Sequence, residues 1–297
     1  MQSTTIKFAR MATQIVHIPE IEKLSPKVIR VMGGNPSKFT LQGTNTYIVG
    51  TGPKRLLIDT GEGKPSWISA IKRVLKEEDI SISETILTHW HHDHTGGQQH
   101  LQELSPETKF YKNTPSDDQL DIEDGQTFKV EGATLRTVYS PGHAQDHMAL
   151  ILEEENAMFT GDNVLGHGTA VFEDLSTYLS SLEKMRAVFK GRAYPGHGPV
   201  IEDGPSKILE YIRHRKMRED QVIQVLKSRK GEDGVGEESG EWTSMEIVKV
   251  IYKDVPENLH MPANGGVLQI LSKLEGEEKV VEDGRTERWR IRNRATL

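Results

Sequence analysis

The sequence of 297 residues contains no cysteine, and this absence removes several classes of function at once. Disulfide frameworks, thiolate zinc fingers, iron–sulfur clusters and cysteine nucleophiles all require a residue that the chain lacks. A metal site in this protein must therefore be built from histidine and carboxylate side chains, which are good ligands for divalent metals.

Long apolar runs and an excess of positive charge are also missing. The longest apolar stretch, Met148 to Leu152, is far short of the roughly 20 residues that cross a bilayer, so we expect no membrane partner. The chain has 37 Lys and Arg against 44 Asp and Glu, a net charge of −7. This balance weighs against non-specific nucleic-acid binding, which depends on basic residues that neutralise phosphates. With 35% hydrophobic and 27% charged residues, the composition is typical of a globular protein.

The N-terminal segment bears on the compartment. It carries Lys7 and Arg10 and no acidic residue before Glu20, a composition that weakly resembles a mitochondrial transit peptide. A cytoplasmic location is the preferred expectation, and the mitochondrial matrix is the alternative. The sequence carries no signal for the oligomeric state.

The pattern of apolar residues divides the chain into two folded units and a linker. An α/β core is predicted over residues 1–229, and the acidic, glycine-rich stretch 230–241 is typical of a flexible linker. Residues 242–297 predict a winged-helix-like unit with helices at about 244–251 and 263–275 and a two-stranded wing at 279–281 and 289–291. In the core we expect strands at 28–32, 45–49, 55–58, 85–88, 126–130, 133–139, 147–153, 157–160 and 193–194, and helices at 65–78, 175–189 and 206–227.

The strongest feature of the sequence is a histidine cluster that follows the short apolar strand at 85–88. His89, His91, Asp93 and His94 lie within six residues. Side chains alternate along an extended chain, so His89 and His91 can point the same way, and the following turn brings Asp93 and His94 toward the same space. Four candidate ligands this close together are hard to explain as packing, and they indicate a site for a divalent metal.

Three further candidate ligands follow later strands. His143, Asp162 and His197 each come at the end of a predicted strand, in a loop that contains glycine. Glycine lets the backbone turn sharply and approach a metal closely. Each of these loops taken singly could be a simple turn, but with the cluster they complete a set of five histidines and two aspartates.

The pattern His-x-His-x-Asp-His, followed by a distant His, Asp and His, resembles the metallo-β-lactamase superfamily in its glyoxalase II-like branch. The segment Leu57-Ile58-Asp59-Thr60-Gly61 matches the first motif of that superfamily, and the resemblance covers about residues 28–215. It implies an α/β fold, the four-layer αββα sandwich, and a site for two divalent metal ions, with zinc expected and manganese or iron also fitting. The resemblance assigns three residues to each ion and one to both. One ion would be held by His89, His91 and His143, the other by Asp93, His94 and His197, and Asp162 would bridge the two.

Three more residues are candidates for supporting roles around this site. The resemblance implies that Asp59 orients ligands through hydrogen bonds, although a turn-stabilising role is the alternative. We interpret His147 as a structural or ligand-orienting residue and His167 as a residue within reach of a substrate. Asp93 is the candidate catalytic residue in addition to being a candidate ligand.

A more specific resemblance, carried by residues 40–47, 59–67 and 161–175, is to the β-lactamase-type thioesterases of fungal aromatic polyketide clusters. Those enzymes release a polyketide from the acyl carrier protein of a non-reducing synthase. The resemblance therefore implies a hydrolase in which a metal-bound hydroxide attacks a thioester, with the carrier protein as partner. The chain length and ring pattern of the acyl group are not indicated.

Single-strand-specific endoribonuclease activity is the alternative, because the mitochondrial β-lactamase-like endoribonuclease of animals shares much of the pattern and the winged C-terminus. RNA would need a basic path along the surface. Residues 285–294 hold five Arg and one Glu, a local +4, but residues 275–283 just before them hold five acids and one Lys, a local −4. This split favours an ordinary solvated surface or a protein contact over a phosphate track. A non-enzymatic family member is disfavoured because no ligand is missing.

Overall fold

The computed structural model describes residues 16–228 and 240–292. Residues 1–15, on which the mitochondrial alternative depends, lie outside the described part, as do residues 229–239, which hold most of the predicted linker, and residues 293–297. The compartment and the linker therefore stay predictions.

Six strands form the first β-sheet, in the order β1-β2-β3-β4-β5-β6. Neighbouring strands run antiparallel from β1 to β4, and β4, β5 and β6 run parallel. Parallel neighbours need a crossover connection, which helices provide after β4 and again after β5. The strands are β1 (Ile21–Lys23), β2 (Val28–Met32), β3 (Asn45–Val49), β4 (Lys54–Ile58), β5 (Ser81–Leu87) and β6 (Lys109–Lys112).

Five strands form the second sheet, in the order β11-β10-β9-β8-β7. All neighbours run antiparallel except β10 and β11, which are parallel. Strands β9 and β10 are buried along their whole length, as expected of strands that are covered on both faces. The strands are β7 (Thr127–Val130), β8 (Ala133–Tyr139), β9 (Met148–Leu152), β10 (Ala157–Gly161) and β11 (Ala193–Pro195).

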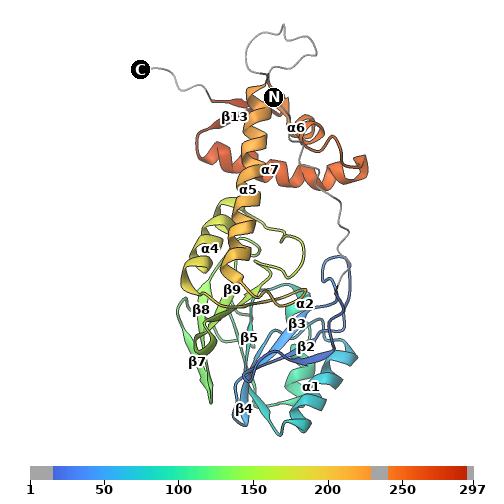
Figure 1. The fold of residues 1–297 in the computed structure, drawn as a ribbon, viewed down its shortest axis with the longest axis vertical. Helices are drawn as coiled ribbons and strands as arrows, with labels where there is room; N and C mark the ends of the chain where they lie inside the picture. The colour runs from blue at the N-terminus through green and yellow to red at the C-terminus, as the bar shows by residue number, and fades with distance from the viewer. Residues whose placement is uncertain (1–15, 229–239, 293–297) are drawn as a thin grey trace, which may run out of the picture.

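Apolar side chains hold the two sheets face to face, and helices cover both outer faces (Figure 1). Tyr47, Leu56 and Ile86 of the first sheet share one core with Leu150 and Phe159 of the second. Helices α1 and α3 cover the first sheet, and α4 and α5 cover the second. The predicted four-layer αββα sandwich is confirmed. The covering helices are α1 (Pro65–Glu77), α3 (Gln98–Leu104), α4 (Leu175–Val188) and α5 (Gly204–Lys227).

Local sequence signals explain where these helices begin. Helix α1 begins at Pro65, whose missing N–H would have no partner in the first turn, and it buries Trp67 and Ile71 against the first sheet. Asp174 caps α4 and Asp203 caps α5, each by accepting a hydrogen bond from the amide three residues along the chain. A helix end with such a cap is defined by its own sequence.

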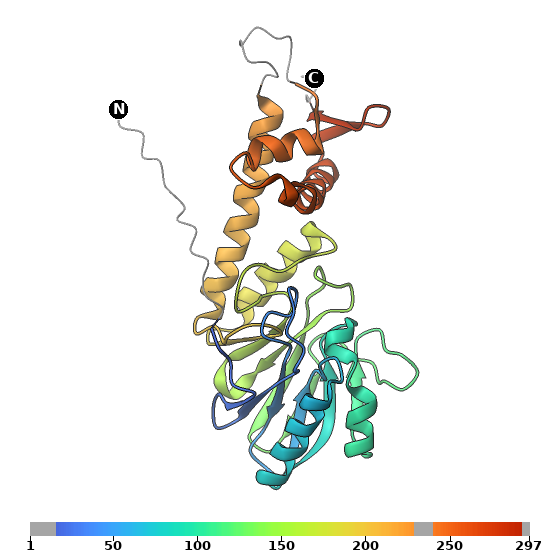
Figure 2. The ribbon, with the colours of Figure 1, turned by 90° about the vertical axis from the view of Figure 1, so that its right-hand side faces the viewer.

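The C-terminal part is a small unit of helices and a three-stranded sheet that packs on α5. A capping box starts its first helix: Thr243 Oγ1 accepts from the amide of Glu246, whose carboxylate accepts from the amide of Thr243. Trp242, Leu271 and Leu274 share one apolar core with α4 and α5. Figure 2 shows α5 running from the sandwich into this unit. The elements are α6 (Ser244–Ile251), α7 (His260–Gly276), β12 (Trp242–Thr243), β13 (Val280–Asp283) and β14 (Arg288–Ile291).

Several boundaries differ from the sequence expectations. Strand β5 begins at Ser81 rather than at Thr85, because its first residues already pair with β4. Helix α7 begins at His260 rather than at 263, since Pro262 lies in the first turn, where a missing N–H is tolerated. Strands β1, β6 and β12 are not among the expected elements; each is short and is defined by pairing with a neighbour. The division of the chain at 229 and 241 stays a prediction.

Within residues 16–228 and 240–292, no helix is both long enough and apolar enough to cross a membrane.

Candidate metal centre

Strand ends bring the seven candidate ligands to one edge of the sandwich. His89 and His91 follow the end of β5, and the next turn, α2 (His92–Thr95), carries Asp93 and His94. The other three come from the second sheet, at or just beyond the ends of β8, β10 and β11: His143, Asp162 and His197. The seven side chains form two neighbouring groups, one of three histidines and one of two histidines and two aspartates.

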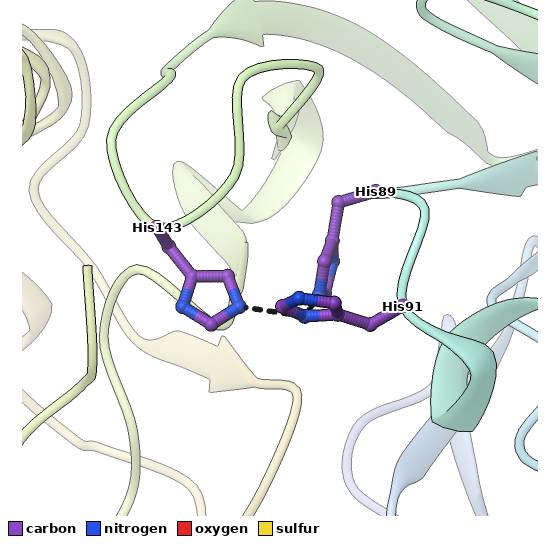
Figure 3. A group of neighbouring side chains, drawn as sticks. All are labelled: His89, His91 and His143. Carbon is purple, nitrogen blue, oxygen red and sulfur yellow. Dashed lines mark hydrogen bonds between the residues drawn. The ribbon is translucent and has the colours of Figure 1, made fainter. Parts of the chain in front are cut away.

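Three histidine rings form the first group. His89 Nε2 lies 2.9 Å from His91 Nδ1, and His143 Nε2 lies 3.0 Å from the same atom. The rings meet nearly at right angles, with interplanar angles of 81° to 86°. Their nitrogens therefore point toward a common space, as Figure 3 shows. Three converging imidazole nitrogens are a suitable ligand set for a divalent metal.

Hydrogen bonds behind these rings determine which nitrogen carries the proton. His143 Nδ1 lies 2.7 Å from the carbonyl oxygen of Val171, and a carbonyl can only accept, so Nδ1 carries the proton. His89 Nδ1 lies 3.0 Å from Thr88 Oγ1, whose own proton is donated to Asp59. In the neutral rings, Nε2 of His89 and Nε2 of His143 therefore carry lone pairs directed at the common space. This neutral form of the ring is the one that binds a metal.

The second group surrounds the carboxylate of Asp162. His197 Nε2 lies 3.1 Å from Asp93 Oδ2 and 3.2 Å from Asp162 Oδ2. His94 Nε2 lies 3.5 Å from Asp93 Oδ2 and 3.4 Å from Asp162 Oδ1. Asp162 also faces the first group, since its Oδ2 lies 3.7 Å from His143 Nε2. Its carboxylate therefore stands between the two groups, in the position that a bridging ligand would take.

Asp59 is buried beside both groups and accepts three hydrogen bonds. Its Oδ1 accepts from the amide of Thr88 at 2.8 Å, and its Oδ2 accepts from Thr88 Oγ1 at 2.9 Å and from His94 Nδ1 at 2.7 Å. The bond from His94 Nδ1 directs Nε2 at the second group, and when the ring is neutral with its proton on Nδ1, Nε2 carries the lone pair that a metal would bind. Asp59 is therefore placed to orient ligands rather than to bind a metal; that role stays a prediction.

Burial and opposite charges set the protonation of the centre. Burial lowers the pKa of His89, and the neighbouring His94 lowers it further. Burial also lowers the pKa of His197, but the carboxylate of Asp162 outweighs it and raises the pKa to about 9. Burial raises the pKa of Asp162, yet His197 and His94 hold it well below its usual range. His89 is thus kept neutral and Asp162 charged, and both are then able to bind a cation.

Close approach of the backbone at Gly196 brings the centre together. A Cβ atom at this position would lie 2.3 Å from Asp162 Oδ1 and 2.9 Å from His94 Cε1. Any larger residue would therefore displace a candidate ligand. This contact gives a physical reason for the glycine that precedes His197.

Two buried polar atoms of the centre, His94 Nε2 and Asp162 Oδ1, have no hydrogen-bond partner among the described residues. Buried polar atoms are normally satisfied, so these two fit a site that receives an ion. A donor set of imidazole nitrogen and carboxylate oxygen suits zinc, and also manganese or iron. The structure is therefore compatible with a divalent-metal centre. The number and identity of the ions, the ligand assignment and the catalytic role of Asp93 stay predictions.

His147 and His167 occupy different surroundings. His147 is fully buried behind the centre, where its Nε2 accepts a hydrogen bond from the amide of Asp162 at 3.2 Å and its Nδ1 lies 3.0 Å from Ser140 Oγ. His147 therefore holds the backbone that carries Asp162. His167 instead lines the pocket beside the centre, within reach of a ligand there. The expected supporting roles of both residues fit these positions and stay predictions.

A pocket of about 460 Å³ opens beside the candidate ligands and is largely apolar on its other walls. Two apolar side chains at the pocket are well exposed, Phe39 at 75% and Val171 at 69%. Such exposure of large apolar groups around a concave site favours an apolar ligand. Beyond the candidate ligands, the wall consists of Lys38, Phe39, Leu41, Leu165, His167, Gly168, Thr169, Ala170, Val171, Phe172 and Glu173.

Sequence reasoning misses three parts of this site. Thr88 links Asp59 to His89, and its place directly before the histidine cluster is a signal that could have identified it. The carbonyl of Val171 that holds His143 carries no sequence signal, because every residue has a carbonyl. Phe39 reaches the pocket from a loop before β3, a position that only the tertiary structure reveals.

Two family models match the chain. Residues 39–114 and 104–197 match the model described as the metallo-beta-lactamase superfamily, and together they span more than half of the sequence. Residues 243–289 match the beta-lactamase associated winged helix domain. The expected winged-helix character of the C-terminal part is therefore confirmed.

The chain is also similar to fungal proteins over most of its length. A lactamase-like protein of Emericella nidulans is 48% identical over 282 residues, which cover 93% of this chain and 91% of the relative. An atrochrysone carboxyl ACP thioesterase of Aspergillus novofumigatus is 51% identical over 246 residues, 82% of this chain and 76% of the relative. Another protein with that description, from a Cryptosporiopsis species, is 46% identical over 276 residues, 90% and 84% of the two chains.

Solved structures show the same fold at low sequence identity. A beta-lactamase domain protein from Burkholderia ambifaria is 16% identical and superposes with a TM-score of 0.76 over 91% of this chain and 93% of its own. A metallo-beta-lactamase family protein from Thermus thermophilus is 22% identical and gives a TM-score of 0.69 over 91% of this chain and 100% of its own. Both likenesses extend beyond the sandwich, because each covers more of the chain than the sandwich alone.

Proposed function

The chain belongs to the metallo-beta-lactamase superfamily, and on this basis we propose that it is a metal-dependent thioesterase that releases an aromatic polyketide from an acyl carrier protein. The observation that carries the proposal is the pair of candidate ligand groups, five of whose seven residues line a largely apolar pocket. Two relatives are named atrochrysone carboxyl ACP thioesterases, which supports a carrier-bound thioester as substrate.

Seven side chains would hold two divalent ions, zinc by expectation. When bound, such ions lower the pKa of water toward about 7 and polarise a carbonyl oxygen. The contribution of the chain is to fix the geometry before the ions arrive, through the hydrogen bonds that Asp59, Thr88 and Val171 make to the rings. The first ion would be held by His89, His91 and His143, and the second by Asp93, His94 and His197. Asp162 would be a ligand of both.

Asp93 is the candidate ligand best placed to act on a proton. Its side chain is 22% exposed and lines the pocket, and its Oδ2 lies 3.1 Å from His197 Nε2. From this position Oδ2 can accept a hydrogen bond from the attacking water and orient it toward a thioester carbonyl. The leaving group is a thiolate, whose conjugate acid has a pKa of about 8.5, so the pocket needs no strong general acid.

The apolar wall of the pocket suits an acyl group better than a nucleotide. Phe39, Leu41, Val171 and Phe172 present carbon surface to the space beside the centre. Burial of apolar surface contributes about 25 cal/mol per Å², so a flat aromatic acyl group would be retained there while water is excluded. This carbon surface offers a phosphate backbone neither a charge nor a hydrogen bond.

Arginines of the wing do not favour the endoribonuclease alternative. Arg288, Arg290 and Arg292 each lie between 3.3 and 3.8 Å from a glutamate carboxylate. RNA binding depends on basic groups that are free to neutralise phosphates. Three of the four arginines in the described part of the basic stretch therefore already have a neighbouring acid.

The test is to purify the protein, measure its metal content and offer it an aromatic acyl thioester and a single-stranded RNA in parallel assays. We expect metal in the protein, thioester hydrolysis and no RNA cleavage. His91→Ala and Asp162→Ala should each abolish hydrolysis, whereas His92→Ala should not, because His92 is an exposed neighbour outside both groups.

Two outcomes would count against the proposal. RNA cleavage without thioester hydrolysis would replace the thioesterase with the nuclease. Full activity in both His91→Ala and Asp162→Ala would mean that the metal centre does not take part in the reaction.

A further inference from the structure

The loop formed by residues 165–173, called here the pocket loop, contributes to both the pocket and the candidate metal centre. It supplies much of the apolar wall of the pocket. It also holds a candidate ligand, because the carbonyl of Val171 accepts the hydrogen bond from His143 Nδ1 at 2.7 Å. That bond leaves Nε2 of His143 as the lone pair that faces the first group. The position of the pocket loop therefore sets the orientation of His143.

Side chains from two helices outside the loop hold it in place. Tyr211 of α5 donates its hydroxyl proton to the carbonyl of Gly168 at 2.8 Å. Arg215 of α5 donates from Nη2 to the carbonyl of Ala170 at 2.7 Å. Gln269 of α7 donates from Nε2 to the carbonyl of Glu173 at 2.9 Å. Three carbonyls of the pocket loop thus accept hydrogen bonds from side chains of α5 and of the C-terminal unit. These bonds take the place of the backbone hydrogen bonds that a strand or helix would supply.

Arg215 makes a second contact that only its planar group allows. Its guanidinium carbon lies 4.6 Å from the centroid of the Phe172 ring, and Phe172 in turn stacks on Tyr178 with an interplanar angle of 16°. Burial lowers the pKa of Arg215, yet an arginine stays protonated at any ordinary pH. A single side chain therefore donates to the carbonyl of one loop residue and stacks on the ring of another, on either side of Val171.

We propose that Arg215 is a positioning residue for the metal centre, acting through the pocket loop on His143. The winged-helix unit takes part in the same support, through Gln269 and through the core that it shares with α5. This inference rests on the proposed metal site but not on the identity of the substrate. It gives the C-terminal unit a role at the centre that does not depend on binding RNA.

The experiment compares metal binding by Arg215→Met and Arg218→Met, with the full chain in both cases. Arg218 is a matched control because it lies on the same helix and stacks over Tyr252 at 4.8 Å, but its hydrogen bond goes to Gln221 and not to the pocket loop. Each variant, stripped of metal, is titrated with zinc against a competing chelator dye. We expect Arg215→Met to bind one of its two zinc equivalents about 10- to 100-fold more weakly than the unmodified protein.

Arg218→Met should bind both equivalents like the unmodified protein. A second readout is the visible spectrum after substitution with cobalt, which should change in Arg215→Met and not in Arg218→Met if the geometry at His143 has shifted. On the thioester, Arg215→Met should lower kcat more than it raises KM. Arg215→Lys, which keeps a donor but not the planar stack, should restore part of the lost affinity.

Wild-type affinity for both zinc equivalents in a folded Arg215→Met would overturn the inference. If that variant does not fold, the test uses Tyr211→Phe, which removes only the hydroxyl that donates to the carbonyl of Gly168. This variant should bind the same zinc equivalent more weakly. Unchanged zinc binding would overturn the inference. A protein that binds two zinc ions but hydrolyses no thioester would refute the proposed function and leave this inference intact.

Discussion

Replacement of Asp59 by asparagine is the most direct test of how the chain prepares its centre. The substitution changes one atom, because the NH₂ group of asparagine takes the place of Oδ2 while Oδ1 is retained. Asp59 is only 2% exposed, and its three hydrogen bonds have lengths of 2.7, 2.8 and 2.9 Å. Two of these bonds end on Oδ2, so two donors, Thr88 Oγ1 and His94 Nδ1, would face an NH₂ group that cannot accept.

The magnitude follows from these bonds. A hydrogen bond to a charged group contributes about 1.5–3 kcal/mol, and two such bonds are at stake. Although burial lowers the pKa of His94, Asp162 and Asp59 raise it well above its usual value, so the ring can respond by releasing its Nδ1 proton and keeping the proton on Nε2. Nδ1 then accepts from the new NH₂ group, and one bond is recovered. The remaining loss is one bond. We therefore expect Asp59→Asn to lower the free energy of unfolding of the metal-free protein by about 1.5–3 kcal/mol.

The same proton shift affects metal binding. A proton on His94 Nε2 occupies the atom that faces Asp93 and Asp162, and a metal ion must displace it. Loss of a group that orients a metal ligand typically lowers affinity about 10- to 100-fold. At about 1.4 kcal/mol for each factor of ten, this corresponds to about 1.4–2.8 kcal/mol of binding free energy. The effect should fall on one of the two metal equivalents, because His94 belongs to one group.

The assay combines urea denaturation of the metal-free protein with a zinc titration against a chelator dye. Asp203→Asn is the control, since Asp203 also accepts two hydrogen bonds and loses the same charge, but it caps α5 on the surface. Asparagine is as good a helix cap as aspartate, so the control should change neither quantity. Unchanged zinc affinity in Asp59→Asn would refute the reasoning that hydrogen bonds behind the rings prepare the ligands.

Three further predictions concern stability. Removal of metal with a chelator should lower the midpoint of thermal unfolding, because an ion present at 1,000 times its Kd stabilises the folded state by about 4 kcal/mol; equal midpoints before and after stripping would contradict this. Tyr47→Phe removes the hydroxyl that donates to the carbonyl of Pro195 at 2.6 Å and should cost about 1 kcal/mol in urea denaturation, so an unchanged stability would show that this bond contributes nothing. Leu271→Ala leaves a cavity in the core shared by α4, α5 and α7 and should lower the free energy of unfolding by about 2–5 kcal/mol within a single transition. Two transitions followed by circular dichroism would show that the C-terminal unit unfolds separately.

Much of the fold and of the candidate ligand set is predictable because local patterns specify it. The strands at 45–49 and 133–139 have the boundaries that their apolar patterns predict. The histidine cluster after β5 stands out because so many ligand-type side chains within one turn have no packing explanation. His143, Asp162 and His197 could be predicted from the glycine loops at strand ends, and Gly196 shows the physical reason, since no Cβ fits beside Asp162.

The remaining parts depend on contacts that are distant in the sequence. Strand β6 (Lys109–Lys112) has two lysines in four residues, and it is defined by its pairing with β5 rather than by an apolar pattern. The contact between Arg215 and the pocket loop joins residues 45 positions apart. A charged residue in a long polar helix gives no sign from sequence that its guanidinium will stack on Phe172. Sequence patterns therefore predict the candidate ligands and miss the groups that hold them.

The hydrogen-bond acceptors next to the candidate histidine ligands explain how a metal site could be assembled without cysteine. A thiolate needs only to lose its proton, whereas an imidazole must also present the correct nitrogen. In this protein each of four rings has its outer nitrogen next to an acceptor: Thr88 behind His89, Asp59 behind His94, and backbone carbonyls behind His143 and His197. Each acceptor holds the Nδ1 proton, so Nε2 of each ring is the atom that faces the centre. Although burial lowers the pKa of His94 and of His197, Asp162 raises both above the usual value, so these two rings release their Nε2 proton when a cation binds. An all-histidine and aspartate site therefore requires the whole sandwich around it, including the pocket loop that α5 supports.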